Sequence, residues 1–106
     1  MTGNEFVSNI YIEKENMLNS YINNNDTFVG KELKELEKAG ASRDKLTEII
    51  DAILIDTFYS ILLGLDGESS FNGIQQTYKL YDENNNLLNE CGQLEAAAFE
   101  HFYGKE

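Results

Sequence analysis

The chain has 106 residues, 42% of them hydrophobic, which predicts a single globular domain over residues 1–106 with a core of its own. Its single cysteine excludes an internal disulfide. The net charge is −11, and residues 46–100 carry ten acids against one base, Lys79. Nucleic acids and anionic membranes are bound by Lys and Arg that neutralise phosphate, so the charge excludes both as partners.

Two helices are predicted in the first forty residues. Apolar residues recur at spacings of three, four and seven over 4–23, and Gly3 or Asn4 is the expected N-cap. The asparagine-rich stretch 23–26 ends this helix. A second, short helix is expected to begin at Asp26 or Thr27 and to stop at Gly40.

A third helix is predicted over 43–64, with Ser42 as its N-cap. It is apolar on most of its circumference, which predicts a central helix packed on every side. Its most apolar window, 52–65, is interrupted by Asp56 and is too short to span a bilayer. Residues 1–20 lack the basic start and apolar run of a signal peptide, so we expect a cytoplasmic protein.

The segment between the third helix and the C-terminus alternates like a strand. Tyr78 and Leu80 share one face over 75–82, and 87–90 reads as a return strand. Residues 92–103 then return to helical spacing. The predicted fold class is therefore α+β, a helix-dominated domain of about four helices with one β-hairpin between the third and last helices.

Asp82, Asn84 and Asn86 alternate in the way that the first three ligands of a calcium loop do. Such a loop needs glycine at its sixth position and a bidentate glutamate at its twelfth, where this chain has Leu87 and Gln93. Asn and Asp also suit tight turns between strands, so the stretch reads as a hairpin loop. We expect no metal and no cofactor.

Catalytic motifs are absent from the sequence. Cys91 and His101 are the single residues of their types, too few for a zinc site without several carboxylates. Asp51 is expected at the exposed edge of the third helix. Asp56 lies within the apolar helix, where a buried carboxylate can act as a functional acid. One hypothesis is therefore a small-ligand binder or enzyme, with a pocket beside helix 43–64 formed by Asp56, Tyr59 and His101.

The stretches "LLGLDGESSFNG" and "YKLYDENNNLLNECGQLEAAAFEHFY" resemble a layout found in small acidic bacterial proteins of unknown function. Some of those proteins are similar to the immunity proteins of polymorphic toxin systems. The resemblance covers about residues 54–103 and rests on Leu65-Asp66-Gly67 and on Glu95, Phe99, Phe102 and Tyr103. It implies a binding role, in which a small acidic domain neutralises a basic toxin.

The charge asymmetry and the missing catalytic motifs favour a non-enzymatic interaction protein that binds a basic protein partner. The acids expected outside the core and in contact with that partner are Asp66, Glu68, Asp82, Glu83 and Glu90. A further hypothesis is a homo-oligomeric structural protein, such as a homodimer, because the third and last helices are apolar on more sides than 106 residues can cover.

Overall fold

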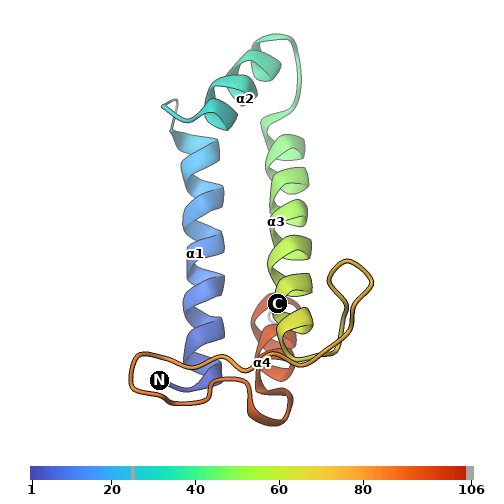
Figure 1. Ribbon diagram of the computed structural model, residues 1–106. Coiled ribbons are helices and arrows are strands. Elements are labelled where there is room, and N and C mark those ends of the chain that lie inside the picture. Colours follow the sequence, from blue (N-terminus) through green and yellow to red (C-terminus); the bar gives the residue numbers. More distant parts are fainter. Residues whose placement is uncertain (25, 105–106) are drawn as a thin grey trace.

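Four α-helices and a 3₁₀ turn form the framework of the computed structural model, which describes residues 1–24 and 26–104 (Figure 1). In chain order these are α1 (Gly3–Asn23), α2 (Phe28–Lys38), α3 (Arg43–Leu65), the turn η1 (Glu90–Gly92) and α4 (Gln93–Phe102). The long helices α1 and α3 run in opposite directions, and α2 joins them at one end. The segment 66–92 and α4 lie at the other end, which we call the acidic end.

The predicted helices are confirmed to within a few residues, and their starts follow from capping side chains. The hydroxyls of Thr27 and Ser42 accept hydrogen bonds from the amides of Gly30 and Lys45, as expected of N-caps. The first cap is Thr2 rather than Gly3 or Asn4, because Thr2 forms a reciprocal capping box with Glu5. The asparagine-rich break includes residue 25, which lies outside the described residues.

The predicted α+β class is wrong, since residues 1–24 and 26–104 contain no strand and so no β-hairpin. The segment from 66 to 89 holds two isolated bridges, Phe71 to Ile74 and Tyr81 to Leu87. Each bridge joins a single pair of residues across a turn or short loop, and neither continues into a β-ladder. None of the helices described in the chain is long and apolar enough to cross a membrane.

The extended segment 75–82 meets 86–88 through two backbone hydrogen bonds, from the Leu88 amide to the Leu80 carbonyl and from the Asp82 amide to the Asn86 carbonyl, but other groups of its backbone bond to α3 and to Asn89. The amide of Tyr78 donates to the carbonyl of Leu65, at the end of α3, over 3.0 Å. The buried side chain of Asn89 accepts from the amide of Leu80 and donates to the carbonyls of Leu65 and Tyr78. Asn89 therefore supplies the bonds that a neighbouring strand would otherwise make.

The core lies at the acidic end, where three helices meet. Its buried side chains are Val7 from α1, Leu62 from α3, and Leu94, Ala97, Ala98 and Phe102 from α4. The two small alanines let α4 approach both long helices closely. The radius of gyration is 16.3 Å, against about 13 Å for a compact domain of this length. The excess arises because α2 and the adjoining halves of α1 and α3 project away from this core.

The expectation that α3 is packed on every side is wrong. Ile49, Ile53 and Ile61 are 49%, 57% and 46% exposed, because α1 and α4 cover only part of the circumference of α3. The apolar residues left open form a second face on this helix, away from α1.

A buried ion pair links the projecting halves of α1 and α3. Lys14 is 1% exposed, and its Nζ lies 2.8 Å from Oδ1 of Asp51 and 3.2 Å from Oε1 of Glu15. The ammonium also lies 4.9 Å from the centre of the Tyr11 ring. Burial alone would lower the pKa of Lys14, but hydrogen bonds and charges from Asp51 and Glu15 outweigh it and raise that pKa. Asp51, expected at the exposed edge of α3, keeps a side chain that is 34% exposed and pairs with the buried Lys14.

Replacing Asp51 with Leu is expected to lower the free energy of unfolding by about 2 kcal/mol, because the Lys14 ammonium stays buried with a weaker partner. Adding Lys14→Met should restore most of that loss by removing the stranded charge. Urea denaturation of both variants measures the effect. Glu35→Gln, which breaks the exposed pair with Lys38, is the control and should change stability by less than about 0.5 kcal/mol. Equal losses in Asp51→Leu and the control would contradict a structural role for the buried pair.

Candidate functional site

Asp66 is the one predicted contact residue that the structure buries, so the expectation that it lies outside the core is wrong. It is 6% exposed and directly follows α3, and its Oδ2 accepts a hydrogen bond from the amide of Glu95 over 2.8 Å. The N-cap of α4 is Gly92, which has no side chain to accept such a bond. Asp66 therefore caps α4 from another element and joins the end of one helix to the start of the next.

Asp82 organises the loop 82–86. Its Oδ1 accepts from the amides of Asn84 and Asn86, and its Oδ2 accepts from the Asn86 side chain and from the amino group of Met1. These bonds, led by those from Asn86, hold the pKa of Asp82 well below its usual range. Both carboxylate oxygens of Asp82 thus have hydrogen-bond donors within the chain, one of which is the Met1 ammonium. No group of three or more His, Cys, Asp or Glu in the described parts of the chain is arranged to hold a metal.

The other predicted acids, Glu68, Glu83 and Glu90, are exposed and lie on the segment 66–92 of the acidic end. Glu68 also interacts with Glu95 in the first turn of α4. Burial raises the pKa of Glu95 above its ordinary 4.5, and the charge of Glu68, a hydrogen bond to Glu68 and the charge of Asp66 add to the rise. Carboxylates therefore crowd one another where α3 ends and α4 begins.

The structure does not gather the three residues of the predicted pocket. Asp56 and Tyr59 lie on the α3 side of α4, where both meet Tyr103: the Tyr103 hydroxyl donates to Asp56 over 3.4 Å, and the two tyrosine rings pack edge to face. His101 instead faces α1, where its Nε2 lies 3.1 Å from Oδ1 of Asn4 and its ring is next to Tyr11. His101 and the C-cap residue Tyr103 thus lie on two separate sides of α4.

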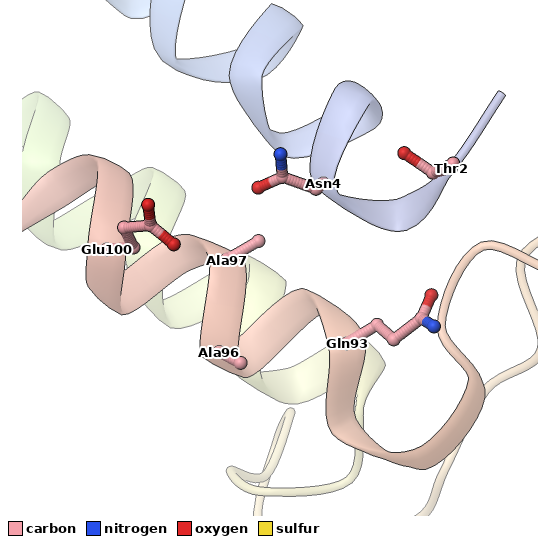
Figure 2. Close-up of a pocket in the computed structure, with 6 residues that line it drawn as sticks. All are labelled: Thr2, Asn4, Gln93, Ala96, Ala97 and Glu100. Carbon is pink, nitrogen blue, oxygen red and sulfur yellow. The ribbon is translucent and has the colours of Figure 1, made fainter.

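The candidate binding site at the acidic end is a groove between α1 and α4. It has a volume of about 270 Å³ and is lined by Thr2, Asn4, Gln93, Ala96, Ala97 and Glu100. Figure 2 shows Thr2 and Asn4 on one wall, opposite Gln93, Ala97 and Glu100. The floor is apolar at the alanines, and Glu100 is the one charged residue of this lining. Such a groove suits a side chain with an apolar stem and a cationic head.

The walls of this groove are held in place by close packing. Gly3, at the start of α1, is buried so tightly against the segment before α4 that a Cβ there would overlap the carbonyl oxygen of Leu88. On the other wall, Gln93 is the first residue of α4, the helix that Asp66 caps. The groove is therefore preorganised by the backbone rather than by long side chains.

Exposed aromatic side chains border the groove along the outer face of α4. Phe99 is 58% exposed and its ring centre lies 6.3 Å from that of Tyr103, which in turn meets Tyr59. Burial and the nearby Asp56 carboxylate raise the pKa of Tyr103, so its hydroxyl stays protonated and donates to that carboxylate. The outer face of α4, meaning Gln93, Ala96, Phe99, Glu100 and Tyr103, thus combines acidic, small and aromatic residues on one continuous surface.

Sequence reasoning missed the residues of this surface. Phe99 and Tyr103 were predicted only as residues that carry the family resemblance, and Glu100 was not considered. A helical projection of 93–103 would have set Glu100 about 160° from the core positions Ala98 and Phe102, whereas Phe99 falls only about 60° from Phe102. Asn4 and Thr2 carried no such signal, because only the fold brings the first residues against α4.

Comparisons with protein-family models, with characterised proteins and with solved structures found no match for this chain. The case for a function therefore rests on the geometry of the acidic end.

Replacing Asp66 with Ala is expected to lower the free energy of unfolding by about 1–2 kcal/mol, because the first turn of α4 loses its cap. Chemical denaturation followed by circular dichroism measures the change. Glu68→Ala removes an exposed acid two residues away and should alter stability by less than about 0.5 kcal/mol. If the two variants were equally stable, Asp66 would not be the residue that caps α4.

Replacing Glu95 with Gln is expected to raise stability at pH 7 and to leave it unchanged at pH 4. The folded state holds the Glu95 proton more tightly than the unfolded chain, whose pKa is near 4.5, so ionisation above that pH favours unfolding. The wild type should therefore lose stability as the pH rises through the window just above 4.5, and the variant should lose less. Thermal denaturation from pH 4 to pH 7 measures this, and parallel curves for the two proteins would contradict it.

Proposed function

We propose that this protein is a non-enzymatic interaction protein that binds a basic protein partner through its acidic end, as an immunity protein or antitoxin does. The observation that carries the proposal is the outer face of α4, where the groove beside Glu100 adjoins the exposed rings of Phe99 and Tyr103. Exposed aromatic side chains are enriched at protein interfaces, and carboxylates around them favour a positively charged partner.

The charge around this face supports a basic partner. Residues 66–104 carry seven acids and one Lys or Arg, Lys79. The glutamates at 68, 83, 90 and 100 are exposed, whereas Asp66 and Asp82 are occupied by internal hydrogen bonds. A surface of this sign attracts a positively charged protein over distance and raises the association rate.

The groove supports a specific contact in addition to long-range attraction. An arginine or lysine of the partner has an aliphatic stem that matches Ala96 and Ala97 and a head that matches the carboxylate of Glu100. The oxygen atoms of Asn4 and Gln93, on opposite walls, are further acceptors for such a head. The partner in this proposal therefore inserts a basic side chain between α1 and α4.

Reversing the charge of Glu68, Glu83, Glu90 and Glu100 to lysine should weaken partner binding by about a hundredfold or more, because the attraction and the groove contact are both lost. The matched control reverses Glu13, Glu32, Glu35 and Glu48, which are exposed and lie outside the acidic end. Both variants change the net charge of −11 by the same amount. Partners are captured from cell extract on the wild type, released by rising salt and identified by mass spectrometry, and affinities are then measured by calorimetry.

The two variants separate a local site from a general effect of charge. Loss of binding in the first variant with wild-type affinity in the control supports the acidic end as the site. Equal affinities in both variants would contradict the proposal. Phe99→Ala is expected to weaken binding by about tenfold, because it removes an exposed aromatic anchor. Wild-type affinity in Phe99→Ala would place the contact away from α4.

A further inference from the structure

A hollow lies beside the C-terminal half of α3. It has a volume of about 410 Å³ and is lined by Asp56, Thr57, Ser60, Ile61, Ser69, Ser70 and Phe71. The first four of these residues belong to α3, and the other three belong to the loop that follows it, which stands on the side of α3 away from α1 (Figure 1). Most of the lining is polar, since a carboxylate and four hydroxyl groups accompany two apolar side chains.

The loop wall of the hollow is fixed by Phe71. Its amide donates to the carbonyl of Ile74 over 3.1 Å, and its carbonyl accepts from the amide of Ile74 over 3.0 Å. The Phe71 ring lies directly on Gly64, so closely that a Cβ at residue 64 would overlap it, and its centre is 5.8 Å from that of the Tyr78 ring. Because the ring packs on α3 and on Tyr78 together, this wall is in place before any ligand binds.

Asp56 gives the hollow its charge. Its Oδ1 accepts a hydrogen bond from the Tyr103 hydroxyl over 3.4 Å, which leaves most of the acceptor capacity of the carboxylate unused. Within residues 1–24 and 26–104 no lysine or arginine forms an ion pair with Asp56, in contrast to Asp51, which pairs with Lys14. The exposed Glu68, next to Ser69 in the chain, is a second acid near the hollow. This charge favours a cation as the ligand.

The hydroxyl groups favour a cation with several N–H donors. The Thr57 hydroxyl already donates to the carbonyl of Ile53 over 2.7 Å, so what it can still offer a ligand is an acceptor. The serine hydroxyls on both walls can accept as well. Acceptors spread around one carboxylate match the five N–H groups of a guanidinium better than the three of an ammonium. The aliphatic stem of an arginine matches Ile61, and a guanidinium plane stacks well on an aromatic ring such as that of Phe71.

The hollow is joined to the outer face of α4 through Tyr103. The hydroxyl of this residue reaches Asp56, and its ring lies next to that of Phe99, beside the groove that contains Glu100. α4 is thus flanked by two depressions with one carboxylate each, the groove on its α1 side and the hollow on its α3 side. A protein that binds over Phe99 lies between the two.

We propose that the hollow binds the guanidinium group of an arginine side chain, with the Asp56 carboxylate as its ion-pair partner and the serine hydroxyls as further acceptors. The source of this arginine rests on the proposed function: it is a second basic side chain of the same protein partner, whose first one enters the groove between α1 and α4. The partner therefore carries two basic side chains, one for each flank of α4.

Nuclear magnetic resonance with N-acetyl-arginine amide, whose only charge is on the side chain, tests the site. Titration into the isotope-labelled protein should shift the amide signals of Ile61, Ser69 and Ser70 in a saturable way. N-acetyl-citrulline amide has a similar shape without the charge and should cause no such shifts. Asp56→Asn keeps an acceptor for Tyr103 but loses the ion pair, so it should lower the affinity by about tenfold or more. Glu48→Gln removes an exposed acid of the same helix outside the hollow and should bind like the wild type.

The same spectra separate this inference from the proposed function. Shifts at Ala96 and Ala97 report on the groove, and shifts at Ser69 and Ser70 report on the hollow. Shifts confined to the groove would overturn the arginine site and leave the proposed function intact, whereas shifts confined to the hollow would support the arginine site and count against the groove. Equal binding of the citrulline amide, or wild-type affinity in Asp56→Asn, would also overturn the proposal.

Free L-arginine distinguishes the two sources of the guanidinium group. The free amino acid carries an α-carboxylate, which the charges of Asp56 and Glu68 repel, so it should bind no more tightly than N-acetyl-arginine amide. That result supports a side chain within a protein as the ligand. Markedly tighter binding of free arginine would assign the hollow to the amino acid itself and would overturn the partner as its source.

Discussion

The packing of α4 against both long helices is the constraint on which the rest of the structure depends. The buried core consists almost wholly of side chains from α4 and those that face it from α1 and α3. Asp66, which directly follows α3, fixes the start of α4, because its carboxylate caps that helix. Asn89 then ties the intervening segment to the end of α3. Without α4, Val7 of α1 and Leu62 of α3 would lose the side chains that complete their burial.

The same constraint explains why the other half of the molecule is an open arm. Above the core, no other described helix lies between α1 and α3. The space between them is occupied by the buried side chain of Lys14, which is paired with Asp51, and not by an apolar side chain. A buried charge of this kind sets the register of the two helices, since a shift along the axis would separate Lys14 from Asp51. Ile49 and Ile53, which α3 turns away from α1, then remain about half exposed.

The binding surface proposed on α4 arises from this incomplete coverage, and so does the open side of α3. α4 buries one side in the core and presents acidic, aromatic and small residues on the other, next to the first turn of α1. The outer face of α3 is instead apolar and lies away from the acidic end's groove. The open sides of α4 and α3 thus differ in their chemistry and lie on different sides of the molecule.

The sequence by itself determined the helices, because capping residues and the spacing of apolar side chains act over only a few positions: Thr27, Ser42 and Gly40 mark the ends that were predicted. It also determined the excess of acid in the second half. The tertiary structure alone decided which groups meet over long separations. The alternation over 75–82 is typical of a strand, but Asn89 and Leu65 form hydrogen bonds with part of this segment. Asp66 was predicted to be a surface acid, but in the structure it is buried against the start of α4. The groove between Asn4 and Glu100 likewise depends on contacts across almost the whole chain, which no local pattern of residues encodes.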